Sequence, residues 1–224
     1  MSKGLPVIIV NLKTYSEGYG RSGLEICRAM DSLSKETGSN LVVAVSATDI
    51  STYSQAVDIP IFAQHVDGVG FGSNTGSILA EAVKEAGATG TLINHAECQI
   101  PWSEIERSLR RCREVGLTTV LCTADAQAIA KGAKYNPDML AVEPPELIGG
   151  DISVSTAKPE VISDSVNIVN SVNSRIPVLC GAGVKNRSDV SKAISLGSQG
   201  ILLASGVVKS TEPKKALKDL IRGL

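Results

Sequence analysis

The chain is poor in aromatic side chains and has no excess of either charge. Only 3% of its 224 residues are aromatic, and 22 basic residues stand against 23 acidic ones spread along the sequence. A general nucleic-acid surface needs basic stripes and stacking aromatics, so we do not expect a nucleic-acid partner. A small anionic ligand is compatible with this balance, because a local pocket can be positive in a neutral protein.

Long apolar runs and paired cysteines are also missing. No stretch approaches the roughly 18 consecutive apolar residues of a membrane span, and the first residues lead into a strand rather than a signal peptide. We therefore expect a cytoplasmic protein with reduced thiols and no membrane partner. Its histidines, His65 and His95, share no ligand spacing with cysteines or acids, so no metal is expected, and His65 is interpreted as structural or interfacial. The five cysteines never form a CxxC pair and are Cys27, Cys98, Cys112, Cys122 and Cys180.

Short apolar runs of strand length, with helical segments between them, are abundant. They are rich in Val, Ile and Leu rather than alternating, which is typical of parallel strands buried on both faces. Eight alternating units predict one (β/α)8 TIM barrel domain over residues 1–224, with an open parallel sheet as the alternative. The eight runs cover residues 6–11, 40–45, 60–64, 91–94, 118–123, 139–143, 177–181 and 200–204. Amphipathic segments include residues 76–87, 103–116, 187–197 and 212–223.

Local residue chemistry predicts where several helices begin and end. Ser103 and Glu106 have the spacing of a capping box, and Pro213 suits a first helical turn. Four glycines are placed to end helices in a left-handed conformation, namely Gly87, Gly116, Gly197 and Gly223. The segment 124–138 leaves room for only about two helical turns.

Polar side chains gather at the carboxyl ends of the predicted strands, where the loops of a barrel converge on one mouth. Taken singly, each has an ordinary structural explanation. A cation, an imidazole and a carboxylate that share one mouth are costly to bury, which favours a catalytic use of the three. The residues in question are Asn11 and Lys13 after the first strand, Gln64 after the third, Asn94, His95 and Glu97 after the fourth, and Glu143 after the sixth.

Glycine-rich turns, "CGAG" and "LASG", follow the last two predicted strands. Gly181, Gly183 and Gly206 would let backbone N–H groups approach an anion, at the usual place of a phosphate site in this fold. No GxGxxG fingerprint follows the first strand, so no dinucleotide cofactor is expected. Together with the cation, the imidazole and the carboxylate, these turns favour proton-transfer chemistry on a small sugar phosphate. A Schiff-base aldolase and a phosphate-binding module without catalysis stay open as alternatives.

Five motifs, in order and over nearly the whole chain, resemble those of the triosephosphate isomerase family. They are "NLK" (11–13), "NHAE" (94–97), "VEPPELIGG" (142–150), "CGAGV" (180–184) and "LLASG" (202–206). The resemblance implies a cofactor-independent isomerase that interconverts dihydroxyacetone phosphate and D-glyceraldehyde 3-phosphate through an enediolate. It also implies a place in glycolysis and gluconeogenesis.

Carried over residue by residue, the resemblance assigns roles within the site. Glu143 would be the base, His95 the electrophile that moves protons at the substrate oxygens, and Lys13 the cation that holds the substrate. Asn11 would lie beside Lys13, and Glu97 would pair with it. Gln64 would support the site, and further substrate contacts would come from Ile148, Gly149, Gly181, Gly183, Ala204 and Ser205.

Two loops carry further expectations from the resemblance. The segment after the sixth strand would close over the site as a lid. The loop "FGSNTG", with Asn74, Thr75 and Gly76, resembles one that this family inserts into a neighbouring subunit. The short chain and the substitutions in its motifs are similar to the archaeal form, so we expect a homo-oligomer, with a tetramer favoured over a dimer. The expected lid consists of Pro144, Pro145, Glu146, Leu147, Ile148, Gly149 and Gly150.

Overall fold

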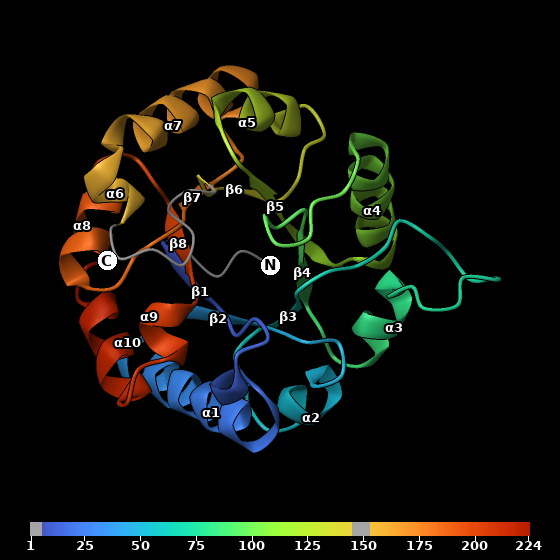
Figure 1. Cartoon of the computed structure of the whole chain (residues 1–224), viewed down its shortest axis with the longest axis horizontal. Coiled ribbons are helices and arrows are strands. Elements are labelled where there is room, and N and C mark those ends of the chain that lie inside the picture. The colour runs from blue at the N-terminus through green and yellow to red at the C-terminus, as the bar shows by residue number, and fades with distance from the viewer. Residues whose placement is uncertain (1–5, 145–152) are drawn as a thin grey trace.

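The computed structural model describes residues 6–144 and 153–224, in which eight parallel strands close into a barrel. Strand order follows chain order from β1 (Val7–Asn11) to β8 (Gly200–Leu203), and these two strands pair with each other. Figure 1 looks into the barrel and shows the helices arranged around it. The predicted (β/α)8 barrel is confirmed, and the open-sheet alternative is wrong.

The remaining strands lie within one residue of the predicted runs at each end. They are β2 (Asn40–Val45), β3 (Ile61–Ala63), β4 (Gly90–Ile93), β5 (Thr118–Thr123), β6 (Met139–Val142) and β7 (Val178–Cys180). Almost every residue in them is buried, because the strands contact helices on one face and the barrel interior on the other.

The apolar side chains of the strands belong to two separate clusters. In β1, Ile8 and Val10 belong to the large cluster between strands and helices, whereas Val7 and Ile9 belong to a smaller one. Alternation along the strand explains this division, since successive side chains point to opposite faces. The smaller cluster fills the barrel interior with Val7, Ile9, Val42, Ala44, Phe62, Leu92, Val120, Cys122, Ala141, Leu179 and Leu202.

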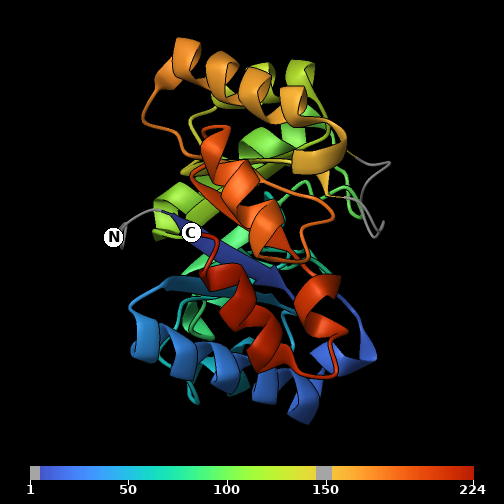
Figure 2. The same ribbon diagram turned by 90° about the vertical axis from the view of Figure 1, so that its left-hand side faces the viewer.

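Helices surround the strands on all sides, and Figure 2 shows the gold helix α7 and the blue helix α1 on opposite sides of them. None of the helices in the described parts of the chain is long and apolar enough to cross a membrane. The helices are η1 (Ser16–Gly18), α1 (Gly20–Thr37), α2 (Ile50–Ser54), α3 (Ala80–Glu85), α4 (Trp102–Val115), α5 (Ala126–Ala133), α6 (Val154–Ala157), α7 (Pro159–Asn173), α8 (Arg187–Ser195), α9 (Ser205–Val208) and α10 (Pro213–Ile221).

Several of the predicted helix ends are confirmed, and others are wrong. Pro213 is in the first turn of α10, and α5 has eight residues, as predicted. Gly87, Gly116 and Gly197 follow α3, α4 and α8 with φ values of 104°, 76° and 95°, as predicted. Gly223, after α10, does not have the predicted left-handed backbone. The capping box of Ser103 and Glu106 is wrong. Helix α4 begins at Trp102, after an N-cap proline without a side-chain hydrogen bond, so Ser103 already lies inside the helix.

Candidate active site

The loop after β1 is held by a buried asparagine. Asn11 is 4% exposed, and its Oδ1 accepts hydrogen bonds from the Lys13 backbone N–H at 2.9 Å and from Gln64 Nε2 at 3.1 Å. The same Gln64 amide donates to the Lys13 carbonyl at 3.0 Å. Lys13 takes a left-handed backbone with φ 51°, which these hydrogen bonds stabilise. Asn11 and Gln64 therefore fix the path of the chain at Lys13.

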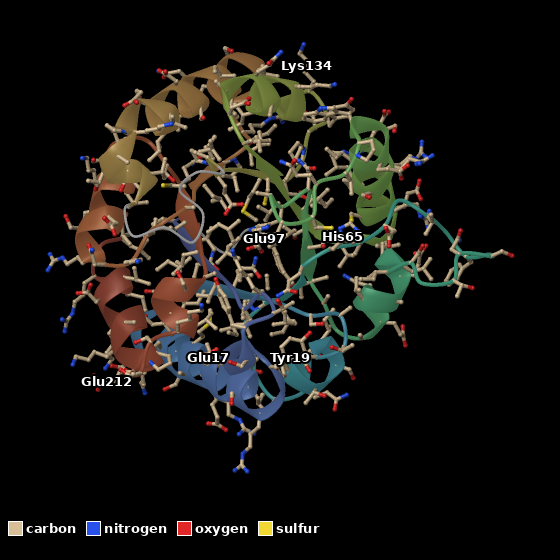
Figure 3. All side chains as sticks on the ribbon, in the orientation of Figure 1. Glu17, Tyr19, His65, Glu97, Lys134 and Glu212 are labelled. Carbon is tan, nitrogen blue, oxygen red and sulfur yellow. The ribbon has the colours of Figure 1, made fainter. Side chains whose placement is uncertain are left out.

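The Lys13 ammonium forms an ion pair with Glu97, the partner that the family resemblance implied. Its Nζ lies 2.7 Å from Glu97 Oε1, and the Lys13 side chain is 9% exposed whereas that of Glu97 is 55% exposed. Figure 3 shows Glu97 near the centre of the view down the barrel. The ion pair thus holds a largely buried cation at the barrel mouth, with its carboxylate partner on the solvent side.

His95 is buried between two carboxylates. The backbone N–H of Glu97 donates to His95 Nδ1 at 3.2 Å, so this nitrogen is an acceptor and a neutral ring carries its proton on Nε2. That Nε2 lies 3.7 Å from Glu143 Oε2, and Nδ1 lies 3.6 Å from Glu97 Oε2. The imidazole therefore presents an N–H donor towards Glu143 and the pocket.

Glu143 follows β6 and is 5% exposed. Its backbone N–H donates to the Thr123 carbonyl at 2.9 Å, which extends the pairing of β6 with β5. Among the described residues, its Oε2 has no hydrogen-bond partner. Burial raises the pKa of this carboxyl, while His95, the Cys122 thiol and Lys13 oppose the rise. A buried carboxylate with an open oxygen has the properties of a general base.

Two buried thiols lie next to this carboxylate. Burial and then the charge of Glu143 raise the pKa of Cys122 and of Cys180, so both thiols are neutral at physiological pH. Cys122 also donates a hydrogen bond that favours the ionised form of Glu143. All five cysteines are free, and of the five only Cys98 is exposed.

Gly181 leaves room for the Glu143 side chain. A Cβ atom at this position would lie 2.8 Å from Glu143 Cγ and 2.9 Å from its Oε1, closer than real Cβ contacts. Gly183 has a left-handed backbone with φ 74°, whereas Gly206 packs closely under the Val184 carbonyl, 3.0 Å from where a Cβ would lie. The glycine turns therefore serve packing and backbone path at the mouth.

One pocket joins the ends of β1, β4, β6, β7 and β8. Sequence reasoning missed Tyr15, Ala182, Val184, Leu202 and Leu203, which line it because of the path of the loops. Among these, Tyr15 forms a cation–π contact, with Lys209 Nζ 4.3 Å from its ring centroid, which links the β1 loop to the end of α9. The lining residues are Asn11, Lys13, Tyr15, His95, Glu143, Ala182, Gly183, Val184, Leu202, Leu203, Ala204 and Ser205.

Several predicted residues lie elsewhere. Pro144 is buried next to the base. His65, labelled in Figure 3, bonds through Nε2 to Asp67 Oδ1 at 3.2 Å and does not line the pocket. Across the described residues, no cluster of three His, Cys, Asp or Glu side chains could hold a metal ion. Six of the expected lid and substrate residues lie outside the described ranges, namely Pro145, Glu146, Leu147, Ile148, Gly149 and Gly150.

The loop with Asn74, Thr75 and Gly76 connects β3 to α3 and projects from the barrel, at the right of Figure 1. Asp67 closes its base, because Asp67 N–H donates to the Ile78 carbonyl and Asp67 Oδ2 accepts from the Ile78 N–H. Predicted helix 76–87 is shorter as a result, and α3 begins only at Ala80. Phe71 in this loop is 82% exposed.

A cation, an imidazole and a buried carboxylate at the carboxyl end of a closed parallel barrel define an acid–base site of a barrel enzyme. The family model for triosephosphate isomerase matches residues 6–223. The chain belongs to the triosephosphate isomerase family.

Relatives agree with this membership, and a solved structure agrees with the fold. A triosephosphate isomerase of Methanosarcina barkeri is 49% identical over 219 residues, covering 98% of this chain and 99% of the relative. That of Archaeoglobus fulgidus is 46% identical, covering 96% of each chain. A crystal structure of the Bartonella henselae triosephosphate isomerase, 20% identical, has a TM-score of 0.74 over 97% of this chain and 96% of its own. At that identity the structure supports the fold alone.

Proposed function

We infer that this chain interconverts dihydroxyacetone phosphate and D-glyceraldehyde 3-phosphate, without a cofactor. The observation that carries the proposal is the 3.7 Å approach of His95 Nε2 to Glu143 Oε2, inside a pocket that Lys13 also lines. A base and a proton donor so close together serve adjacent carbon and oxygen atoms of one small substrate. Family membership supports the same reaction.

The reaction divides into proton transfers that return the enzyme to its starting state. Glu143 takes a proton from C1 of dihydroxyacetone phosphate, and the C–H electron pair forms the C1–C2 double bond of an enediolate. His95 Nε2–H stabilises the charge at O2 and moves protons between the two oxygens, while the Lys13 ammonium offsets the negative charge. Glu143 then returns its proton to C2, which gives D-glyceraldehyde 3-phosphate.

The phosphate group would bind where the turns after β7 and β8 meet. Gly183, Ala204 and Ser205 line this part of the pocket, and Gly181 lies beside the base. Backbone N–H groups of glycine turns are suited to an anion because no side chain blocks its approach. Contacts from Ile148 and Gly149 remain an expectation from the family resemblance.

A coupled isomerase assay on the purified protein tests the proposal directly. Glu143→Asp moves the carboxylate away from the substrate carbon and should lower kcat by about 100-fold, because a displacement near 1 Å has that effect. Unchanged circular dichroism and melting temperature would show that the fold is intact. A variant with full activity would rule out Glu143 as the base.

The two alternatives predict other results. A Schiff-base aldolase needs a reactive lysine, and none occurs within β5, β6, β7 or β8. Treatment with borohydride and substrate should therefore leave the mass of the protein unchanged. A phosphate-binding module would bind substrate without turnover, which the coupled assay distinguishes.

We further propose a cytoplasmic homo-oligomer, a tetramer rather than a dimer, that acts in glycolysis and gluconeogenesis. The projecting loop supports the oligomer, because it resembles the loop that this family inserts into a neighbouring subunit and it carries Phe71, which is 82% exposed. Asn74, Thr75 and Gly76 follow Phe71 in this loop and would enter the neighbouring subunit.

A further inference from the structure

Asn94, the residue before His95, has a left-handed backbone conformation with φ 60°. Among the described non-glycine residues, only Lys13 and Asn136 share this conformation. Left-handed geometry is costly for most side chains but is tolerated by asparagine, whose short amide forms local hydrogen bonds. The chain therefore turns sharply between β4 and His95.

The Asn94 side chain bridges two segments on either side of this turn. Its Nδ2 donates to the Cys122 carbonyl of β5 at 3.0 Å, and its Oδ1 accepts from the Ile100 N–H at 3.0 Å. One amide thus ties the rigid barrel wall to the far end of the 95–100 loop. Both ends of this loop are fixed to Asn94, one through the chain and the other through the hydrogen bond.

The loop closed in this way carries the contacts that orient His95. The Cys98 N–H donates to the His95 carbonyl at 2.7 Å, and the Glu97 N–H donates to His95 Nδ1 at 3.2 Å. The second contact decides which ring nitrogen carries the proton, since a nitrogen that accepts cannot also donate. A shift of the loop would remove the Glu97 N–H from Nδ1 and release the tautomer.

We propose that Asn94 is a positioning residue that selects the Nε2–H tautomer of His95 by holding the 95–100 loop against β5. It acts through the Glu97 backbone and does not line the pocket itself. The consequence for turnover rests on the proposed function, because it assumes that His95 Nε2–H faces the substrate oxygens. The effect on the tautomer does not depend on that assumption.

Asn94→Gly isolates the side chain, because glycine accepts the left-handed backbone without strain. Asn136→Gly is a matched control. Asn136 has φ 50° and its Oδ1 accepts from Asn173 Nδ2 at 3.1 Å, on a segment between α5 and β6. Each protein would be labelled with ¹⁵N-histidine, and His65→Gln would assign the two imidazoles.

In the wild type, His95 should show one tautomer with an unprotonated Nδ1. In Asn94→Gly, the Nδ1 and Nε2 resonances should move towards each other as the tautomers mix. The value of kcat should fall by about 10- to 100-fold, with KM changed much less, because orientation rather than binding is lost. Asn136→Gly should keep both the spectrum and kcat, within about twofold.

The inference is overturned if Asn94→Gly keeps the wild-type imidazole spectrum, whatever happens to kcat, because a loss of kcat alone would reflect general loosening. A wild type without isomerase activity would refute the proposed function, while the spectrum would still decide the role of Asn94. Should Asn94→Gly fail to fold, Asn94→Asp keeps the acceptor for Ile100 and loses the donor to β5. Tautomer mixing in that variant supports the inference, and an unchanged spectrum overturns it.

Discussion

The Nε2 atom of His95 lies 3.7 Å from the Oε2 atom of Glu143, and the two side chains are only 8% and 6% exposed. The distance is longer than a hydrogen bond, so neither side chain occupies the hydrogen-bonding atom of the other. The approach arises because β4 and β6 both point their carboxyl ends at the same mouth. An imidazole donor and an open carboxylate oxygen therefore remain available to a substrate between them.

Stability should rise when the buried charge is removed. Glu143→Gln eliminates a carboxylate whose Oε2 has no partner among the described residues, so we expect unfolding at pH 8 to cost about 1–2 kcal/mol more than in the wild type. Turnover should be lost in the same variant. Denaturant unfolding followed by circular dichroism measures the change.

The pH dependence of this gain has a definite sign. Burial raises the folded-state pKa of Glu143 above 4.5, its ordinary value. The loss of unfolding free energy that Glu143 causes in the wild type is thus absent below pH 4.5. It grows as the pH rises through the folded-state pKa and is complete above that pKa. Glu85→Gln, at an exposed position, is the control and should stay within about 0.5 kcal/mol. A gain that does not depend on pH would contradict the explanation.

The fall of kcat/KM at low pH, its acid limb, should follow the protonation of Glu143, since a protonated Glu143 cannot accept the substrate proton. Burial raises its pKa, Lys13 lowers it, and the charge of Glu97 raises it slightly. Glu97→Gln removes the negative charge that raises the pKa of Glu143, and it also frees the Lys13 ammonium from its ion pair. Both changes lower the pKa of Glu143, so the acid limb should move to lower pH. Rates measured from pH 4 to 8 would show the shift. A limb displaced to higher pH would contradict this assignment.

The barrel and the central site residues could be predicted from the sequence for a physical reason. Strands that are buried on both faces need continuous apolar runs, and their ends are marked by turn residues. Once eight parallel strands are assigned, all residues after strand ends share one mouth. Asn11, Lys13, Gln64, His95 and Glu143 could therefore be grouped before any distance was known.

Other features depend on packing that no local pattern records. Helix α4 begins at Trp102, whose ring stacks on that of Tyr135 with centroids 5.9 Å apart, so a contact with the turn after α5 accompanies the start of the helix, which Ser103 does not cap. Tyr15 reaches the pocket because the β1 loop bends towards Lys209. Both contacts join segments far apart in the chain, where the periodicity of the sequence contains no signal.

Gly181 provides a test of space around the base. Alanine there would place a Cβ 2.8 Å from Glu143 Cγ and 2.9 Å from the Leu202 carbonyl, so the carboxylate or the β7 turn must move. We expect Gly181→Ala to lower kcat by about 100-fold, since a base displaced by 1 Å loses its alignment. Gly70→Ala is the control, because its Cβ would meet only Arg111 at 3.9 Å, an ordinary contact. Equal kcat in the two variants would contradict the prediction.

Phe71 tests the proposed assembly. This side chain is 82% exposed in the isolated chain, and burying a phenylalanine in a neighbouring subunit stabilises an interface by about 1.5–3 kcal/mol. Phe71→Ser should therefore weaken association by about 10- to 100-fold, which sedimentation velocity over a range of protein concentrations would detect as smaller species. Val172→Ser on α7 is the matched control, because Val172 is also exposed, at 44%, and lies on a different face. If Phe71→Ser sediments as the wild type does, the loop is not an anchor of the oligomer, and Asn74, Thr75 and Gly76 lose their proposed role with it.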